Sequence, residues 1–266
     1  MRALYLLLFK RMPHYSKLAL VSCGLFVLLA GCTQDLTDPN AIIERAKAAH
    51  GSELLEHAVI EFDFRDKHYR ATRDGGRFMN ERIYEDSTGS VREVLTNDDL
   101  FQEINGVRQA DAEDEVPPYL SSLNSVIYFA LLPMNLTDPA VRSNYLGTVE
   151  IKGKPYYKVE VTFVQEDGGI DYDDRFIYWF NKETFIMEYL AYGFHVNDGG
   201  TRMREAINPR RLGGALFSDY LNFKSERLPE PGDSIEIYDS LLDTEDIELL
   251  STIELENLSI TPIATQ

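Results

Sequence analysis

Short segments of alternating polarity follow one another along most of this chain, with turn-forming sequences between them. In the segment 58–64, the apolar residues Ile60, Phe62 and Phe64 alternate with acidic ones. An alternation of period two is typical of a strand with one buried face. Separators such as Asp74-Gly75-Gly76 contain the residues that tight hairpin turns require. The pattern predicts an antiparallel meander, because parallel strands need long crossover connections.

The same pattern recurs to residue 223, and a sheet of so many consecutive strands curls or closes rather than staying flat. The tail from 235 to 260 is ambiguous and fits a strand, a short acidic helix and a final strand at 252–260. The other expected strands are 58–64, 68–73, 77–85, 90–96, 99–104, 145–151, 156–164, 175–180, 185–192, 201–208 and 214–223.

Two helices interrupt the strands. Residues 40–50 place apolar side chains at helical spacing, with Asp38 as N-cap and Gly51 as C-cap. Residues 119–132 are apolar on nearly every face towards their C-terminal end, which is typical of a helix that is buried or covers a cavity. The sequence therefore predicts a mainly β (α+β) fold, a curved antiparallel half-barrel of about ten strands lidded by one or two helices.

The N-terminal residues have the organisation of an export signal. Basic residues, the last of them Lys17, precede the uncharged run 18–31. This run is shorter than the roughly 20 residues that a membrane-spanning helix needs. A basic segment, an apolar segment and small residues at a cleavage point are typical of a signal peptide.

The uncharged run leads into Leu29-Ala30-Gly31-Cys32, which resembles the lipobox of bacterial lipoproteins. The resemblance implies that residues 1–31 are a lipoprotein signal peptide and that Cys32 is acylated, with palmitate among the expected modifications. Residues 32–38 would then be an acylated tether and residues 39–266 a single half-barrel-like domain. The implied location is the cell envelope, lipid-anchored at the outer membrane, with the membrane face left open. An ordinary secretory signal or a single membrane anchor is the alternative.

Removal of the signal would simplify the chemistry of the mature chain. Cys23 would leave with it and Cys32 would be acylated, so no thiol and no disulfide would remain. The chain carries a net charge of −18, and the removed segment contains four basic and no acidic residues, so the mature net charge would be −22. Such a surface repels nucleic acid and anionic headgroups. We therefore expect no nucleic-acid partner, and membrane attachment through the lipid anchor.

The titratable residues form no recognisable catalytic or metal-binding motif. The acidic loop 166–174 lacks the Glu that closes a twelve-residue calcium loop. The histidines lack metal-binding spacing, and no Gly-x-Ser-x-Gly elbow is present. We therefore predict no metal, no cofactor and no catalytic residue. The acidic and histidine residues in question are Glu166, Asp167, Asp171, Asp173, Asp174, His50, His57, His68 and His195.

The order of the predicted elements is similar to that of the lipoprotein-localisation half-barrels, the fold of the periplasmic lipoprotein carrier and its outer-membrane receptor. The similarity covers roughly residues 40–225, and its best local piece is the aromatic strand and return strand at 178–192. In that fold an incomplete barrel, lidded by helices, encloses an apolar cavity for acyl chains. The segments 128–133, 178–179, 189–192 and 199–202 also resemble an uncharacterised family of bacterial lipoproteins, which implies no activity.

Aromatic and basic side chains make up the predicted ligand site. Aromatic walls with few polar groups suit a lipid-sized pocket, and they suit a solid core equally well. Arg202 and Arg204 share one face of a strand. Their guanidinium groups either bind a ligand carboxylate or phosphate at a cavity mouth or pair with acidic residues of neighbouring strands. The predicted ligand-binding residues are Phe62, Phe64, Tyr128, Phe129, Trp179, Tyr189, Arg202 and Arg204.

The function that these features favour is non-enzymatic: a membrane-anchored lipoprotein that binds or transfers an apolar ligand, such as a lipid or a lipoprotein acyl chain. A first alternative is a structural or interaction lipoprotein with a filled core, whose acidic face docks an envelope protein. A second is a hydrolase or lyase that uses a carboxylate such as Asp171 or Asp219. The sequence leaves the ligand, the protein partner and the oligomeric state open.

Overall fold

The computed structural model describes residues 36–110, 119–164, 174–195 and 199–264, and residues 36–266 make up one compact unit. Cys32 and most of the acidic loop 166–174 lie outside the described residues. Within the described ranges, fourteen strands form two seven-stranded antiparallel sheets, accompanied by three α-helices. None of the helices in these ranges combines the length and the hydropathy needed to cross a bilayer.

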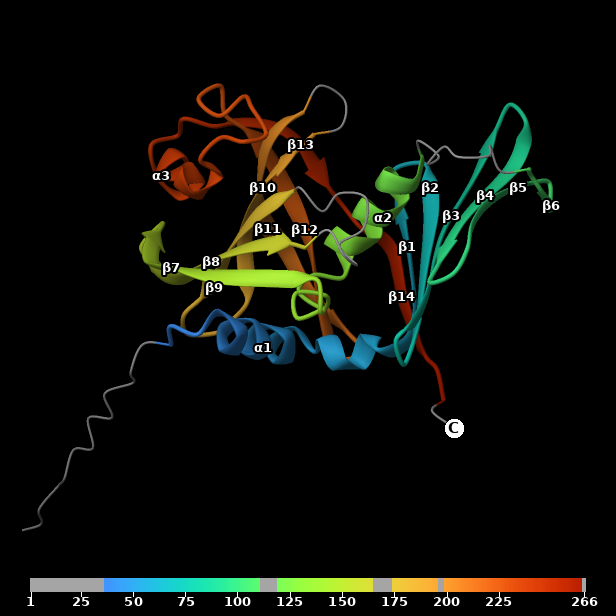
Figure 1. The fold of residues 1–266 in the computed structure, drawn as a ribbon, viewed down its shortest axis with the longest axis horizontal. Helices are drawn as coiled ribbons and strands as arrows, with labels where there is room; N and C mark the ends of the chain where they lie inside the picture. Colours follow the sequence, from blue (N-terminus) through green and yellow to red (C-terminus); the bar gives the residue numbers. More distant parts are fainter. Residues whose placement is uncertain (1–35, 111–118, 165–173, 196–198, 265–266) are drawn as a thin grey trace, which may run out of the picture. The chain divides into compact units, whose positions relative to one another are not determined.

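The two sheets take up separate halves of the chain, apart from the last strand, which joins the first sheet (Figure 1). The helices are α1 (Pro39–His50), α2 (Tyr119–Ala130) and α3 (Tyr238–Asp243), with 3-10 turns η1 (Ser52–Leu55) and η2 (Ile235–Ile237). The first sheet contains, in spatial order, β14 (Glu256–Pro262), β1 (His57–Phe64), β2 (Lys67–Asp74), β3 (Arg77–Asp86), β4 (Gly89–Thr96), β5 (Leu100–Ile104) and β6 (Val107–Arg108). The second contains β13 (Glu248–Ile253), β12 (Ala215–Lys224), β11 (Gly200–Leu212), β10 (Met187–Phe194), β9 (Arg175–Asn181), β8 (Lys154–Phe163) and β7 (Val141–Ile151).

The last two strands join the sheets. β13 pairs with β12 at the edge of the second sheet, and β14 pairs with β1 at the edge of the first. Only Glu254 and Leu255 separate the two strands, so the chain passes directly from one sheet to the other. The predicted mainly β, open half-barrel is confirmed, but its wall is two sheets joined by this strand pair rather than one sheet. The single final strand expected at 252–260 is correspondingly wrong, because it is divided at residues 254–255.

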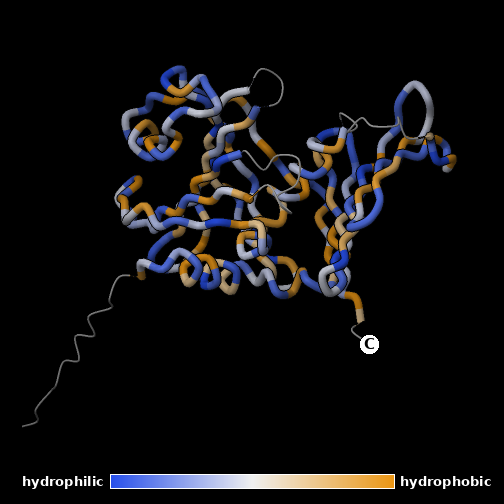
Figure 2. The backbone as a smooth tube through the Cα atoms, in the orientation of Figure 1, coloured by the Kyte–Doolittle hydropathy of each residue, from blue (hydrophilic) through white to orange (hydrophobic). Residues whose placement is uncertain are grey.

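Each helix covers one apolar cluster. The α1 core packs Ile42 and Ile43 against the side of the second sheet that carries Tyr178 and Phe180. The α3 core lies on the other side of that sheet, where Tyr238 and Leu241 of α3 pack against Trp179 and its neighbours. The α2 core joins Leu123 and Ile127 to the first sheet. The strands accordingly alternate between apolar and polar residues along their length (Figure 2).

Local sequence explains where α1 begins and ends. The carboxylate of Asp38 accepts a hydrogen bond from the backbone N–H of Asn40 at 3.0 Å, and Pro39 occupies the first turn. Gly51 ends the helix in the left-handed conformation, with φ of 69°. A Cβ at this position would lie 2.8 Å from the carbonyl oxygen of Gly214, so both conformation and space require glycine. The predicted helix at 40–50 and its two caps are confirmed.

A buried carboxylate holds the junction between the sheets. Asp219 is 7% exposed, and its Oδ1 accepts a hydrogen bond from the backbone N–H of Leu255 at 3.0 Å. Arg210 pairs with the same carboxylate at 2.9 Å and donates to the carbonyl oxygen of Leu255. Asn208 donates to Asp219 Oδ2 at 3.2 Å. Asp219 therefore ties the β11–β12 hairpin to the residues that link β13 to β14.

We expect Asp219→Ala to lower the free energy of unfolding by about 2–3 kcal/mol, because it leaves a buried N–H and a partly buried guanidinium without their acceptor. Urea unfolding of the unit 36–266 measures the change. The matched control is Asp99→Ala, which removes an ion pair to Arg108 that is exposed on both sides and should cost much less. Equal effects of the two substitutions would contradict the role given to Asp219.

His50 makes stability depend on pH. Its Nε2 accepts a hydrogen bond from the backbone N–H of Met187 at 3.0 Å, and the side chain is 4% exposed. Burial, with a smaller contribution from the nearby Arg211, lowers the pKa of His50 from 6.5 to about 4. Between pH 6.5 and about 4, His50 therefore binds a proton in the unfolded chain but stays neutral in the folded chain.

The contribution of His50 to stability is complete above pH 6.5 and falls by about 3 kcal/mol as the pH drops to about 4. In His50→Gln, the amide oxygen can still accept the hydrogen bond from Met187 but does not titrate. The decrease in the free energy of unfolding at acidic pH should therefore be smaller in this variant. Urea unfolding between pH 4 and pH 7 tests the expectation, with His57→Gln at a more exposed position as control. An unchanged pH profile in His50→Gln would count against it.

Candidate functional site

α2 is the element around which the candidate site is built, because it packs against both sheets (Figure 1). On one side Leu123 and Ile127 contact the first sheet, and on the other Tyr128 and Phe129 contact the second. A helix with more than one apolar face fits this position, since two of its faces each meet a sheet. The predicted helix at 119–132 is confirmed, although it ends at Ala130.

Side chains of both sheets form hydrogen bonds with α2. Arg82 of β3 donates a hydrogen bond to Ser122 Oγ at 2.8 Å and is itself paired with Glu93. The Tyr128 and Tyr178 hydroxyls lie 2.8 Å apart, and burial raises the pKa of both phenols. The remaining contacts of α2 in the described part of the chain are largely apolar. Burial of apolar surface on both sides of the helix therefore stabilises its position.

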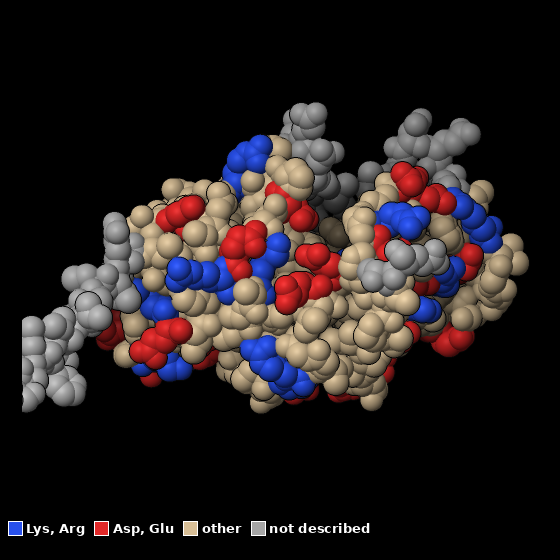
Figure 3. All heavy atoms as spheres, turned by 90° about the horizontal axis from the view of Figure 1, so that it is seen from below, with Lys and Arg blue, Asp and Glu red and all other residues tan. Residues whose placement is uncertain are grey.

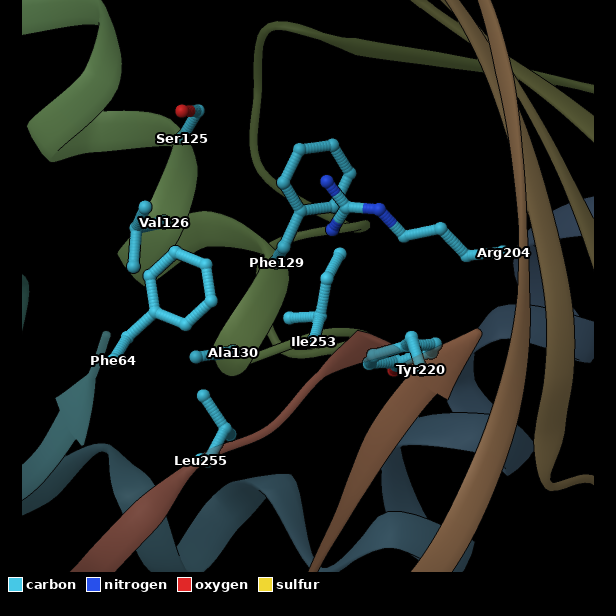
Figure 4. Close-up of a pocket in the computed structure, with 9 residues that line it drawn as sticks. All are labelled: Phe64, Ser125, Val126, Phe129, Ala130, Arg204, Tyr220, Ile253 and Leu255. Carbon is cyan, nitrogen blue, oxygen red and sulfur yellow. The ribbon is translucent and has the colours of Figure 1, made fainter. Parts of the chain in front are cut away.

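A small apolar pocket lies beside α2, with a volume of about 60 Å³ (Figure 4). Its walls come from β1, α2, β11, β12, β13 and the junction residue Leu255, so both sheets and the helix contribute. Such a volume has room for a few heavy atoms only, against about 150 Å³ for a cavity known to hold benzene. The lining residues are Phe64, Ser125, Val126, Phe129, Ala130, Arg204, Tyr220, Ile253 and Leu255.

Arg204 is the one charged residue among those that line the pocket. It extends from β11 so that its guanidinium carbon lies 3.8 Å from the centre of the Phe129 ring (Figure 4). Its Nη2 donates to the Tyr192 hydroxyl at 2.9 Å, while its buried Nε has no hydrogen-bond partner among the described residues. The residue is 9% exposed, and no described carboxylate lies within ion-pair distance. Stacking on aromatic rings partly offsets the cost of burying this cation.

Tyr220 stands next to Arg204 in the pocket wall. Burial raises the pKa of its phenol to about 12, and the positive charge of Arg204 acts in the opposite direction. The phenol is therefore neutral at physiological pH and offers a hydroxyl group beside the guanidinium. The pocket thus combines apolar walls with one cation and one neutral hydroxyl, an arrangement suited to binding rather than to acid–base chemistry.

The structure brings together only part of the predicted site. Phe64, Phe129 and Arg204 line the pocket, and Phe62 and Tyr128 lie in the adjoining α2 and α1 cores. These residues come from three segments far apart in the sequence. Their meeting depends on the position of α2 between the sheets.

Trp179 and Tyr189 lie on the opposite side of the second sheet, in the α3 core. Trp179 Nε1 donates to Asp239 at 3.2 Å, and Asp239 also pairs with Lys158 at 2.6 Å, which fastens α3 to the sheet. The Tyr189 hydroxyl donates to Glu205 on the same side. The structure therefore places neither aromatic residue at the pocket, and both are left out of the candidate site.

Arg202 shares the inner face with Arg204 but does not line the pocket. It stacks over Phe194, with its guanidinium carbon 4.9 Å from the ring centre, and donates to the carbonyl oxygen of Thr201. The apolar character of α2 was the signal that could have identified Val126 and Ala130 as lining residues. No comparable signal existed for Tyr220, which becomes a neighbour of Arg204 only through the register of β11 and β12. The lining residues not predicted from the sequence are Ser125, Val126, Ala130, Tyr220, Ile253 and Leu255.

A second, wider cavity of about 550 Å³ is lined by Asn124 of α2 and by residues that follow the helix. Its lining is mostly polar and includes Lys47, Arg73, Asn80, Asn124 and Asp138. Burial lowers the pKa of Arg73 to about 10, and that guanidinium donates to the backbone of its own strand. This cavity lacks the apolar walls of the pocket beside α2.

The remaining titratable groups form no metal centre in the described ranges, where no three His, Cys, Asp or Glu side chains come together. Asp174, the described member of the acidic loop, lies 3.5 Å from His195. Asp219, the carboxylate of the alternative hydrolase or lyase, is occupied by Arg210, Asn208 and Leu255 at the sheet junction. Its contacts are those of a structural residue.

Comparison with solved structures finds distant likenesses that cover most of the chain. A LolA superfamily protein from Nitrosomonas europaea has 11% identity and a TM-score of 0.45, with 87% of this chain and 96% of that one covered. A DUF1329 family protein from Desulfovibrio piger has 12% identity and a TM-score of 0.48, with 84% and 93% covered. A putative outer membrane lipoprotein-sorting protein domain from Vibrio parahaemolyticus has 9% identity and a TM-score of 0.40, with 70% and 86% covered.

A search of the curated proteins found no match. One family model, described as a family of unknown function (DUF6503), matches residues 18–255. The match spans most of the chain and includes α2, the pocket and every strand of both sheets except β14. It confirms the expectation of an uncharacterised family. The chain belongs to the DUF6503 family, whose function is unknown.

Proposed function

We propose that this protein is a lipid-anchored protein of the cell envelope whose half-barrel binds an apolar ligand, a lipid or an acyl chain, beside α2. The observation that carries the proposal is the pocket between α2 and both sheets, whose walls are apolar except for Ser125, Arg204 and Tyr220. Apolar walls with a few convergent polar groups are typical of sites for hydrophobic ligands. The proposal contains no reaction, since the geometry gives Asp219 a structural role.

The size of the pocket requires α2 to move. Sites for drug-sized ligands have volumes of roughly 300–1,000 Å³, whereas this pocket has about 60 Å³. The contacts that fasten α2 include one hydrogen bond to Arg82, the Tyr128–Tyr178 pair and the stacking of Phe129 on Arg204. In this proposal the described arrangement is the closed form, and displacement of α2 from the second sheet would extend the pocket along the aromatic surface of the α1 core.

The filled-core alternative, in which an acidic face docks a partner, finds less support in the described surface. On the face shown in Figure 3, acidic and basic side chains are interspersed rather than separated into one acidic patch. Exposed opposite charges in such proximity neutralise each other locally. The net negative charge of the chain is therefore not concentrated on that face.

We expect Ala130→Leu to weaken binding of an apolar probe at least tenfold, because the added atoms fill the pocket that the ligand must enter. Titration of the unit 36–266 with N-phenyl-1-naphthylamine, an uncharged fluorophore that brightens in apolar surroundings, measures the affinity. Ala48→Leu is the matched control, because residue 48 is exposed on α1. Binding that is undetectable in the unsubstituted protein would favour the filled-core alternative.

The proposed anchor has its own test. When the full chain is produced in bacteria with labelled palmitate, Cys32→Ala should abolish labelling and release the protein from the membrane fraction. Cys23→Ala is the control, because Cys23 lies in the segment that the proposal removes before attachment. Labelling that persists in Cys32→Ala would contradict the assignment of Cys32 as the lipid attachment point, without affecting the proposal of a ligand site.

A further inference from the structure

We infer that the ligand of this site is an amphiphile with a carboxylate next to its hydrocarbon chain, of the long-chain fatty acid class, and that Arg204 pairs with the carboxylate. The inference rests on the proposed function and names its ligand class. It assigns the polar end of the ligand to the pocket beside α2. The chain would continue from there into the space that α2 vacates.

Arg204 is a buried cation without a counter-ion. Nine-tenths of the residue is buried, its Nε is without a partner and no described carboxylate neutralises it. Two other buried cations of the described chain are paired: Arg82 with Glu93, and Lys158 with Asp239. In a chain with 44 acidic and 26 basic residues, a missing partner does not reflect a shortage of acids. A buried unpaired charge costs stability, so its retention points to a partner supplied from outside.

The geometry of the guanidinium fits a carboxylate head group. A guanidinium presents its N–H donors in a planar fork that matches a carboxylate, with Nε and one terminal nitrogen on one edge. Arg204 Nη2 is engaged with Tyr192, which leaves Nε to donate to an incoming oxygen. The neutral hydroxyl of Tyr220 borders the same pocket. A single cation neutralises a monoanion, whereas a phosphate dianion would keep an uncompensated charge among apolar walls.

The volume and polarity of the pocket also select the head group. The pocket of about 60 Å³ accommodates a carboxylate and the first methylene groups, and its other walls are formed by Phe64, Val126 and Ile253. A zwitterionic or sugar head group exceeds this space. A neutral ester would enter the same walls, and its carbonyl oxygen could accept from Nε, but it would leave the positive charge of Arg204 uncompensated.

The test compares cis-parinaric acid with its methyl ester, because both have the same fluorescent chain and only the acid has a charge at neutral pH. The unit 36–266 should bind the acid at least tenfold more tightly than the ester. In Arg204→Met this preference should vanish through loss of acid binding, with the affinity for the ester changed less than threefold. Arg202→Met, on the same face but outside the pocket, should keep the full preference.

Three further measurements distinguish ligand binding from a merely structural effect. Urea unfolding should show that Arg204→Met is at least as stable as the unsubstituted protein, since an unpaired buried cation has been replaced by an apolar side chain. Arg204→Lys, which keeps the charge but loses the fork, should show an intermediate preference for the acid. In the unsubstituted protein, the NMR signal of the Arg204 Nε–H should shift further with the acid than with the ester.

The outcomes separate the two proposals. Equal binding of acid and ester by the unsubstituted protein would overturn the carboxylate inference and leave the apolar site intact. Failure of both probes to bind would overturn the proposed function itself. A preference for the acid that survives in Arg204→Met would place the carboxylate elsewhere and contradict the inference.

Discussion

The carboxylate of Asp219 is the point on which the two-sheet arrangement depends. It accepts hydrogen bonds from the β11 segment, through Asn208 and Arg210, and from the backbone at Leu255. These contacts fix where the C-terminal chain leaves the second sheet and joins the first. Leu255 also lines the pocket, so the same contacts fix one of the walls beside α2.

The candidate site combines a sheet wall with a helix. The strands are fixed by continuous antiparallel pairing, whereas α2 is held by apolar contacts together with hydrogen bonds such as those of Ser122 and Tyr128. Apolar contact is non-directional, so the proposed ligand chain would replace it at little cost in energy. Arg204 differs, because its unpaired Nε would add a specific interaction to a site whose other walls are mostly apolar.

Sequence patterns were sufficient for most of the local structure up to residue 224, but not for the C-terminal tail. Alternating polarity located the strands of both meanders, capping residues located α1, and the uniform hydrophobicity of 119–132 identified the helix enclosed by two walls. These features depend on neighbouring residues, which is why one sequence reveals them. The division of the wall into two sheets depends on β14 pairing with β1, a contact between the two ends of the fold that no local pattern records.

Which residues line the pocket depends on the pairing register of the strands, and the sequence did not reveal that register. In the β11–β12 hairpin, Leu212 pairs with Ala215, and a simple continuation would place Arg204 opposite Phe223. A β-bulge between Ile207 and Arg210 shifts the register by one, so Arg204 pairs with Asn222 and Ala206 with Tyr220. A shift of one residue changes which side chains share a face. For the same reason, aromatic content alone did not separate Phe129 at the pocket from Trp179 on the opposite side.

The placement of β14 also orders the events of assembly. β1 is the first strand of the fold, yet its pairing partner is the last, with Ala58 opposite Pro262. A chain synthesised from its N-terminus would expose this edge of β1 until β14 had been made. Contacts so distant in sequence form slowly, and unpaired strand edges invite association with other chains. Closure of the half-barrel therefore follows synthesis of β14, and a factor that covers the edge of β1 would be most useful before that point.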